Sequence, residues 1–249
     1  MTRVRTPLLV AVALGATTLA GCASTPPVLP DATPTTTATA PSDPWGQLAG
    51  RVAAARDNRY VAAYTLQTRG RPARTVAVTV ATDGSWLVTV PGGALGGTAD
   101  IAVAGTKNGL YQCALAPPGG CIRVANPDGA LPTKSDPRVQ HLFSDWLDAL
   151  GNRDAALSVA SSAPLPGSRG QCFSVEPNSA ALAPPVDPGV YCFDEKGALT
   201  AAALALGTVT LASAIAPAPP TVTLPGPVVP GAPLGTAAPP PSPSASPSR

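Results

Sequence analysis

Short alternating apolar stretches joined by two-residue turns constrain this chain more than any other feature of its sequence. Asp83-Gly84, Asn108-Gly109 and Lys196-Gly197 each stand between two such stretches. Dipeptides of this kind favour the tight turns of β-hairpins, and a hairpin pairs its two strands antiparallel. Alternation of apolar and polar residues, as from Val76 to Val80, is typical of strands that bury one face. The sequence therefore predicts an antiparallel β-sheet.

Two helices are predicted to accompany the sheet. The first begins at Asp43 and Pro44, because aspartate caps a helix and proline suits its first turn. The second runs from Asp136 to Gly151 and carries one apolar stripe at helical spacing. We also expect a short helix over residues 154–161 and an edge strand over residues 221–224. The fold class is α+β, a curved antiparallel sheet with helices packed on one face.

The first residues are typical of a secretory signal. Arg3 and Arg5 precede an uncharged run from Leu8 to Ala20, which is shorter than the roughly 20 residues that span a bilayer. We therefore predict a cleaved signal peptide over residues 1–21. The alternative for the cysteine that follows, Cys22, is a chance residue in an ordinary secreted protein.

The last residues of that segment, Leu19-Ala20-Gly21-Cys22, resemble the lipobox of bacterial lipoproteins. The resemblance implies that the Cys22 thiol carries a diacylglyceryl lipid after cleavage. Two or more acyl chains hold a protein stably at a membrane. We therefore expect the chain at the extracytoplasmic face of the cell membrane, held there by its lipid anchor.

The chain has five cysteines, so an odd one remains after internal pairing. With Cys22 set aside, the other four allow three disulfide pairings. We favour Cys113–Cys121 and Cys172–Cys192, because each pair is close in sequence and disulfides persist outside the cytoplasm. The rival interpretation is a metal site. It requires ligand spacings that are missing here, since there is no Cys-x-x-Cys and a single histidine, so we expect no metal.

Composition divides the mature chain into three parts. Residues 22–42 hold the lipidated cysteine and a Pro- and Thr-rich tether, which lacks the apolar residues needed for a core. Residues 43–229 have the size and apolar content of one globular domain. Residues 230–249 are rich in proline and serine and are predicted to form a disordered tail.

Charge and motifs argue against several function classes. Without Arg3 and Arg5 the basic and acidic residues are equal in number, which disfavours nucleic acid as a partner. His141 is interpreted as a helix-surface histidine, and no Gly-x-Ser-x-Gly elbow accompanies it. The glycine-rich loop Gly92–Gly97 lacks the lysine and hydroxyl of a phosphate loop. We expect neither an enzyme nor a cofactor.

The bulky residues of the predicted strands and second helix have two interpretations. They fill a solid core, or they line an apolar cavity that the sheet and helices leave open for acyl chains. The candidate cavity residues are Tyr64, Leu66, Val78, Trp86, Val88, Phe143 and Trp146. Both interpretations fit the same pattern of residues.

The order of elements resembles a known family. A lipobox, a tether and a first helix precede "YTLQTRGRPARTVAVTVATDGSWLVTV", and a middle helix precedes "GVYCFDEKGALTAAALALGTVTL". This arrangement resembles the LolA-like fold and is similar to actinobacterial lipoproteins of the LppX and LprG type. The resemblance implies a half-open antiparallel β-barrel closed by helices, with an apolar cavity that carries a lipid at the cell envelope. It implies no catalytic residues.

A second function fits the same sequence. The domain would then be a non-enzymatic envelope module with a closed core, whose partner is an exported protein or the cell wall. The Pro-rich tail would be a candidate contact surface for that partner.

Replacing Cys22 tests the predicted anchor. We expect the Cys22→Ala variant to leave the membrane fraction and to lose incorporation of a labelled fatty acid, because no thiol remains to accept the lipid. Fractionation of cells that express the variant or the parent chain measures this. Retention of the variant in the membrane fraction would contradict the anchor.

Overall fold

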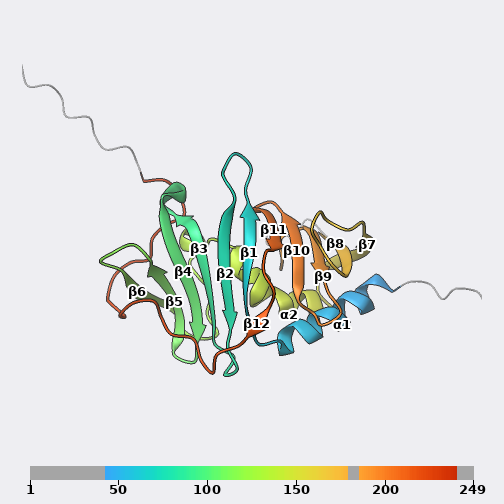
Figure 1. Cartoon of the computed structure of the whole chain (residues 1–249), viewed down its shortest axis with the longest axis horizontal. Coiled ribbons are helices and arrows are strands. Elements are labelled where there is room, and N and C mark those ends of the chain that lie inside the picture. The colour runs from blue at the N-terminus through green and yellow to red at the C-terminus, as the bar shows by residue number, and fades with distance from the viewer. Residues whose placement is uncertain (1–42, 179–184, 240–249) are drawn as a thin grey trace, which may run out of the picture. The chain divides into compact units, whose positions relative to one another are not determined.

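A computed structural model of the chain describes residues 43–178 and 185–239. The predicted signal peptide, Cys22 and most of the tether lie outside the described residues. So do residues 179–184 and 240–249. The described residues from the predicted globular domain form one sheet with helices, as Figure 1 shows.

The sheet contains twelve strands, and each pair of neighbouring strands is antiparallel. The first meander consists of β1 (Tyr60–Gln67), β2 (Arg74–Val80), β3 (Trp86–Ala94), β4 (Ala99–Thr106), β5 (Gly109–Ala114) and β6 (Gly120–Ala125). The second consists of β7 (Leu157–Ser162), β8 (Gln171–Pro177), β9 (Gly189–Phe193), β10 (Leu199–Leu204) and β11 (Gly207–Leu211). All three predicted two-residue turns lie between consecutive strands, so the antiparallel sheet is confirmed.

The two meanders meet at their first and last strands. β1 pairs with β11, with Tyr64 opposite Leu211, and the short β12 (Ala216–Pro217) pairs with the start of β1. The strand order therefore runs from β6 inward to β1, then through β11 outward to β7. Among the described strands, β6 and β7 do not pair with each other, so the sheet is open.

The helices lie on one face of the sheet (Figure 1). Helix α1 (Pro44–Asp57) begins as predicted, because the Asp43 carboxylate accepts a hydrogen bond from Gly46 N at 2.9 Å. Leu48 and Val52 of α1 are fully buried against the core. α1 contacts the second helical segment, which lies between β6 and β7 in the sequence.

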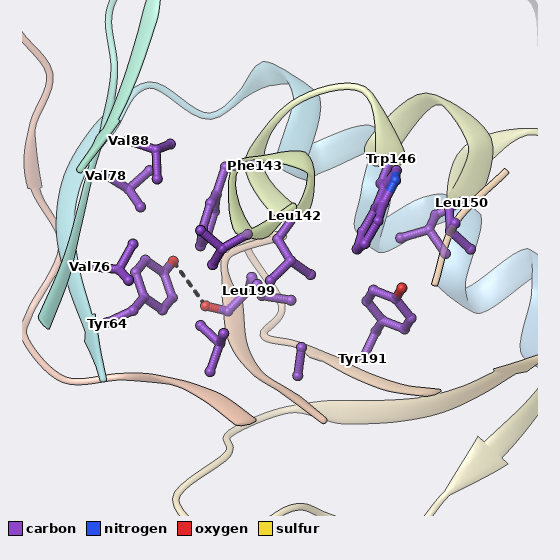
Figure 2. Close-up of a cluster of buried hydrophobic side chains, with 14 of the residues drawn as sticks. Tyr64, Val76, Val78, Val88, Leu142, Phe143, Trp146, Leu150, Tyr191 and Leu199 are labelled. Carbon is purple, nitrogen blue, oxygen red and sulfur yellow. Dashed lines mark hydrogen bonds between the residues drawn. The ribbon is translucent and has the colours of Figure 1, made fainter. Parts of the chain in front are cut away.

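The space beneath this helical cover is filled by side chains (Figure 2). Tyr64 is fully buried, its ring centroid lies 4.8 Å from that of Phe143, and its hydroxyl donates to Leu199 O at 3.1 Å. The buried phenol thus keeps a hydrogen-bond partner, which burial of a polar group requires. The remaining labelled core residues are Val76, Val78, Val88, Leu142, Trp146, Leu150 and Tyr191.

The predicted continuous helix from Asp136 to Gly151 is wrong. The structure has a 3₁₀ turn η3 (Val139–Phe143), a break at Ser144 and a short helix α2 (Trp146–Gly151). Asp136 does not cap a helix; its carboxylate accepts from Arg138 N, a local turn that competes with helix formation. Ser144 has non-helical φ and ψ of −134° and −116°. The apolar spacing correctly predicted which side chains are buried. It did not predict the side-chain hydrogen bonds that interrupt the helix.

Two smaller predictions are also wrong. The short helix expected over residues 154–161 is absent, and most of that stretch belongs to β7 (Leu157–Ser162), because pairing with β8 overrides the weak local helix signal. Residues 221–224 form no strand; they belong to an extended segment that crosses the sheet. We name residues 216–239 the C-terminal strap.

The strap contributes mostly carbonyl oxygens to the sheet. Pro219 O and Pro220 O accept from the backbone of the β2–β3 turn at Thr82 and Asp83, and Pro227 O accepts from Cys121 N at 2.8 Å. Proline has no N–H, so a proline-rich segment satisfies donors without leaving unpaired donors of its own. A parallel bridge between Cys121 and Val228 seats the strap along the edge strand β6.

The strap remains packed beyond residue 230, where we expected the disordered tail to begin. The buried Gln112 side chain donates to Leu234 O at 2.9 Å and accepts from Leu234 N at 2.6 Å, and it also donates to Ser135 O. Leu95 N donates to Gly235 O at 2.8 Å. The packed part of the chain therefore extends at least to these residues.

Two disulfides join Cys113 to Cys121 and Cys172 to Cys192. These are the pairs favoured by the sequence. The first pair links β5 to β6 and lies with Ala102, Ala104 and Tyr111 in a small cluster on the face that the strap crosses. The second links β8 to β9.

Replacing Gln112 tests how firmly the strap is held. We expect Gln112→Leu to lower the free energy of unfolding by about 2–4 kcal/mol, because three main-chain groups lose their buried partner. Gln171→Ala, which removes an exposed glutamine, should change it by less than about 0.5 kcal/mol. Urea denaturation measures both values. Equal stabilities for the two variants would contradict the anchoring role of Gln112.

Candidate functional site

A hollow surrounds Trp86 at the end of the sheet where β1 and β3 begin. It has two adjoining parts of about 180 and 520 Å³, and both are lined by Trp86, Ser144 and Asp148. Gly105 on β4 makes room for the indole, because a Cβ at that position would lie 2.4 Å from the Trp86 ring. The hollow exists where the helical segment does not cover the ends of the strands.

The smaller part lies between α1 and the starts of β1 and β3. Its apolar lining includes Tyr60, Val80, Phe143 and Leu147. Arg56 and Arg59 stand at this side, and Arg56 forms an exposed ion pair with Asp148 at 2.9 Å. This part combines aromatic side chains with a rim that holds Arg59 and the Arg56–Asp148 ion pair.

The larger part lies between the loop after β6 and the helical segment. Leu110 and Leu131 supply its apolar lining, and Ala130 stands on the loop. Asp128 and Asp145 add carboxylates to the rim. A volume of about 520 Å³ falls within the range of small-molecule sites, roughly 300–1,000 Å³.

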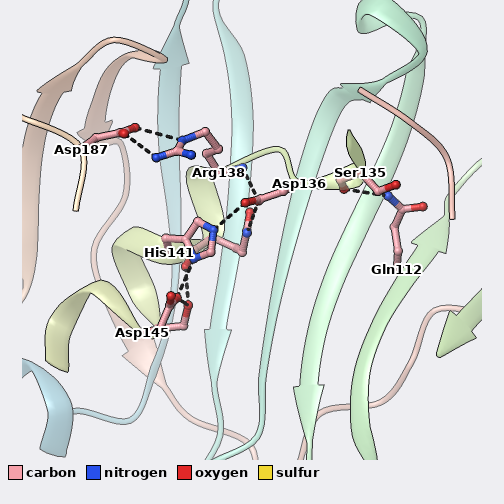
Figure 3. A network of polar contacts seen from close by, with 9 residues as sticks. Gln112, Ser135, Asp136, Arg138, His141, Asp145 and Asp187 are labelled. Carbon is pink, nitrogen blue, oxygen red and sulfur yellow. Dashed lines mark hydrogen bonds and ion pairs between the residues drawn. The ribbon is translucent and has the colours of Figure 1, made fainter. Parts of the chain in front are cut away.

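His141 holds the broken helical segment in place (Figure 3). Its Nε2 lies 2.8 Å from the Asp136 carboxylate and its Nδ1 lies 2.6 Å from Asp145. Its ring stacks on Trp146 with a centroid distance of 5.2 Å. The predicted surface histidine is thus the centre of a polar cluster beside the hollow.

Two carboxylates set the charge of His141. Burial alone would lower the pKa of His141, but hydrogen bonds to Asp136 and Asp145 outweigh it and raise the pKa to about 9. Burial raises the pKa of each carboxyl, yet the hydrogen bond from His141 leaves both pKa values below their usual range. The imidazolium donates through both nitrogens, so neither nitrogen is free to accept a proton from a substrate at neutral pH.

Arg138 fixes the other side of the same segment. Its guanidinium pairs with the Asp187 carboxylate and lies 5.5 Å from the centroid of the Trp146 ring. The Asp187 hydrogen bond outweighs burial and raises the pKa of Arg138. The indole therefore packs against two cationic side chains, and these contacts fix the start of α2.

The seven candidate cavity residues do not come together around one hollow. Trp86 and Phe143 line the hollow described above, and Leu66 lines another at the opposite end of β1. The other four, Tyr64, Val78, Val88 and Trp146, are packed in the filled core. Their spacing correctly predicted which face of the strands is buried. It did not predict where the helical segment leaves that face uncovered.

Sequence reasoning missed the carboxylates around His141 and two arginines on the β1–β2 hairpin. The spacing of His141 and Asp145, four residues apart, was a usable signal for a local ion pair. Arg71 and Arg74 line the hollow at the far end of β1. Three arginines within the stretch "RGRPAR" were the signal for that group.

Neither a metal site nor a membrane-spanning helix is found among the described residues. Within residues 43–178 and 185–239, no group of three or more His, Cys, Asp or Glu side chains is arranged to hold a metal ion. Nor does any helix in these ranges have the length and apolarity needed to cross a membrane. No family model matches the chain, and no curated protein matches it.

The raised pKa of His141 predicts how stability depends on pH. The stabilisation from its ion pairs should be complete below about pH 6.5 and lost as the pH rises to about 9. We expect His141→Gln to be less stable than the parent by about 1–2 kcal/mol at pH 6, after allowance for solvent screening. Denaturation at pH 6, 8 and 10 measures this. A difference that stays constant across the three values would contradict the ion pairs.

Proposed function

We propose that this chain is a non-enzymatic lipoprotein of the cell envelope that binds or carries a lipid. The hollow around Trp86 carries the proposal, because it is apolar on its floor and open to solvent at the end of the sheet. Its larger part, about 520 Å³, is of the size of a ligand site. An acyl chain would occupy it, with each methylene that leaves water contributing about 0.8 kcal/mol.

The fold supports this proposal. The open antiparallel sheet with helices on one face shares these coarser features with the LolA-like carriers that the sequence resembles. The sheet is neither closed nor strongly curled, so the half-open barrel itself is part of the proposal. The helical segment between β6 and β7 would be the cover of that barrel. Its break at Ser144 lies beside the hollow, where a continuous helix would have followed a different path over the strands.

The location proposed for the protein rests on its cysteines. Cys22 would carry the lipid anchor and place the domain at the extracytoplasmic face of the membrane, on a tether of residues 22–42. Disulfides such as Cys113–Cys121 and Cys172–Cys192 persist in oxidising compartments, which supports that location. The membrane would be the first partner, and the bound lipid the second.

A second candidate function is favoured by the filled core. Tyr64, Tyr191 and Phe173 are fully buried between sheet and helices, so a ligand has no passage through the centre of the domain. The protein would then be a structural or interaction module of the envelope that binds an exported protein or the cell wall. Under this alternative the hollow around Trp86 would hold no lipid.

Filling the hollow separates the two candidates. We expect Ala130→Trp to reduce the lipid that co-purifies with the full chain by about tenfold or more, because an indole in place of the methyl group displaces several methylenes of an acyl chain. Lipid extracts of the parent and variant proteins, purified from the same cells, are compared by mass spectrometry.

The matched control is Ala160→Trp, which places the same side chain on an exposed position of β7 away from the hollow. Its bound lipid should equal that of the parent chain. If no lipid co-purifies with any form and none binds to the delipidated chain, the carrier function fails and the interaction module is favoured. Equal loss from both variants would place the lipid outside the hollow.

A further inference from the structure

A separate hollow of about 210 Å³ lies at the other end of β1–β3 from Trp86. The hairpin between β1 and β2 projects beyond the neighbouring strands at this end (Figure 1). Arg71 and Arg74 line the hollow from this hairpin, and the glycine-rich end of β3 with η1 (Leu95–Gly97) lines it from the opposite side. Leu66, Val90 and Leu206 supply its apolar lining, and its polar lining includes Asp136, Arg138 and Thr236.

Arg74 is held in place by neutral acceptors alone. Its guanidinium donates to Pro91 O at 2.7 Å, to Gly92 O at 3.3 Å and to Thr68 Oγ1 at 3.0 Å. Its Nε is buried and has no hydrogen-bond partner among the described residues. A cation fixed in this way is positioned before any ligand arrives, which reduces the entropy lost on binding.

Arg71 depends on the glycines of the opposite wall. Its guanidinium donates to Gly96 O at 2.7 Å. A Cβ on Gly97 would lie 1.8 Å from the Arg71 guanidinium, and a Cβ on Gly92 would lie 2.8 Å from that of Arg74. Both glycines also have positive φ, so the loop needs them for its backbone and for the approach of both arginines.

No carboxylate forms an ion pair with Arg71 or Arg74 in the described parts of the chain. The carboxylates of Asp136 and Asp100, which lie near the two arginines, make hydrogen bonds to other groups. Asp136 binds His141, and Asp100 accepts from Gly92 N at 2.7 Å. The third arginine of the hollow, Arg138, pairs with Asp187. The hollow therefore presents two guanidiniums whose charge is not neutralised by contact.

This arrangement has an electrostatic cost that an anion would remove. Burial, and then the like charge of Arg71, lower the pKa of Arg74, while Asp100 opposes the effect. Two cations that share a hollow without a bound anion repel each other. An oxyanion between them would make charge-assisted hydrogen bonds with both, and guanidinium forks match the geometry of phosphate oxygens.

We propose that Arg71 and Arg74, with the Gly92–Gly97 loop, form a binding site for a phosphate group. Leu66, Val90 and Leu206 would contact an apolar chain attached to that phosphate. The phosphate could belong to a lipid headgroup or be free in solution, since both offer the same oxygens. The site goes beyond the lipid hollow at Trp86 and does not rest on it, because the filled core separates the two ends of β1.

The test uses the full chain with Cys22→Ala, so that no lipid anchor contributes, titrated with inorganic phosphate and followed by NMR. We expect saturable shifts of the backbone amide signals of Gly92, Gly93, Gly96 and Gly97. Arg71→Gln and Arg74→Gln should each weaken binding by about tenfold or more, because each removes a charged donor. Added salt should weaken binding further.

Arg169→Gln is the matched control, because it removes one exposed charge outside the hollow and should leave binding unchanged. Gly97→Ala keeps both arginines but displaces Arg71, so it should weaken binding as Arg71→Gln does. Absence of saturable shifts in the glycine loop would overturn the site, and so would equal binding by the Arg71 and Arg74 variants and the control.

Vesicles distinguish the two sources of phosphate. The same chain is sedimented with vesicles of phosphatidylcholine alone or mixed with an equal amount of phosphatidylglycerol. Arg71-dependent retention on the mixed vesicles assigns the site to lipid headgroups, and phosphate binding without such retention assigns it to free phosphate. Neither result depends on lipid in the Trp86 hollow, which Ala130→Trp tests separately.

Discussion

The pairing of β1 with β11 is the contact that makes one domain out of two meanders. Tyr64 and Leu211 lie opposite each other across it although the whole helical segment and nine strands separate them in the chain. Such a distant pairing costs loop-closure entropy, and packing in the core must offset that cost. Tyr64 supplies that support from the middle of β1, through its contacts with Phe143 and Leu199. The loss of this single strand pair would separate the sheet into two halves that share no edge.

The helical segment explains why the two ends of the sheet differ. It covers the centre, where Phe143 and Trp146 are buried, and it leaves the strand ends uncovered on both sides. At one end Trp86 and apolar neighbours line an open hollow, and at the other Arg71 and Arg74 face a glycine loop. Polar contacts of His141 and Arg138 fix the path of the segment between these ends. The chemistry of each proposed site thus follows from where this short segment starts, breaks and stops.

Local patterns in the sequence predicted the antiparallel sheet, the first helix, the three tight turns and the paired cysteines. They were informative because turn chemistry and alternation act over a few residues. The second helix was predicted wrongly, since the hydrogen bonds of Asp136 and Ser144 compete with helical ones and the apolar spacing does not reveal them. The candidate cavity residues lie in separate parts of the domain for a different reason. Val78 and Trp86 share a strand-face pattern, but which of them is covered depends on the path of a segment distant in sequence.

The proline-rich strap has a consequence for how molecules of this protein meet one another. An open sheet exposes unpaired backbone groups at its edge strands, which invite strands of other chains to add and aggregate. At β6 the backbone N–H and C=O of Cys121 are bonded to Pro227 O and Val229 N of the strap. The prolines of the strap have no N–H to donate to a strand of another chain. A strand from another chain could pair with β6 only after the strap is displaced. The strap is also held by the Gln112 side chain on β5, which bonds both backbone groups of Leu234. Pro227 and Val229, inside the predicted globular domain, therefore end the sheet at β6, and Leu234, in the predicted tail, helps to hold them there.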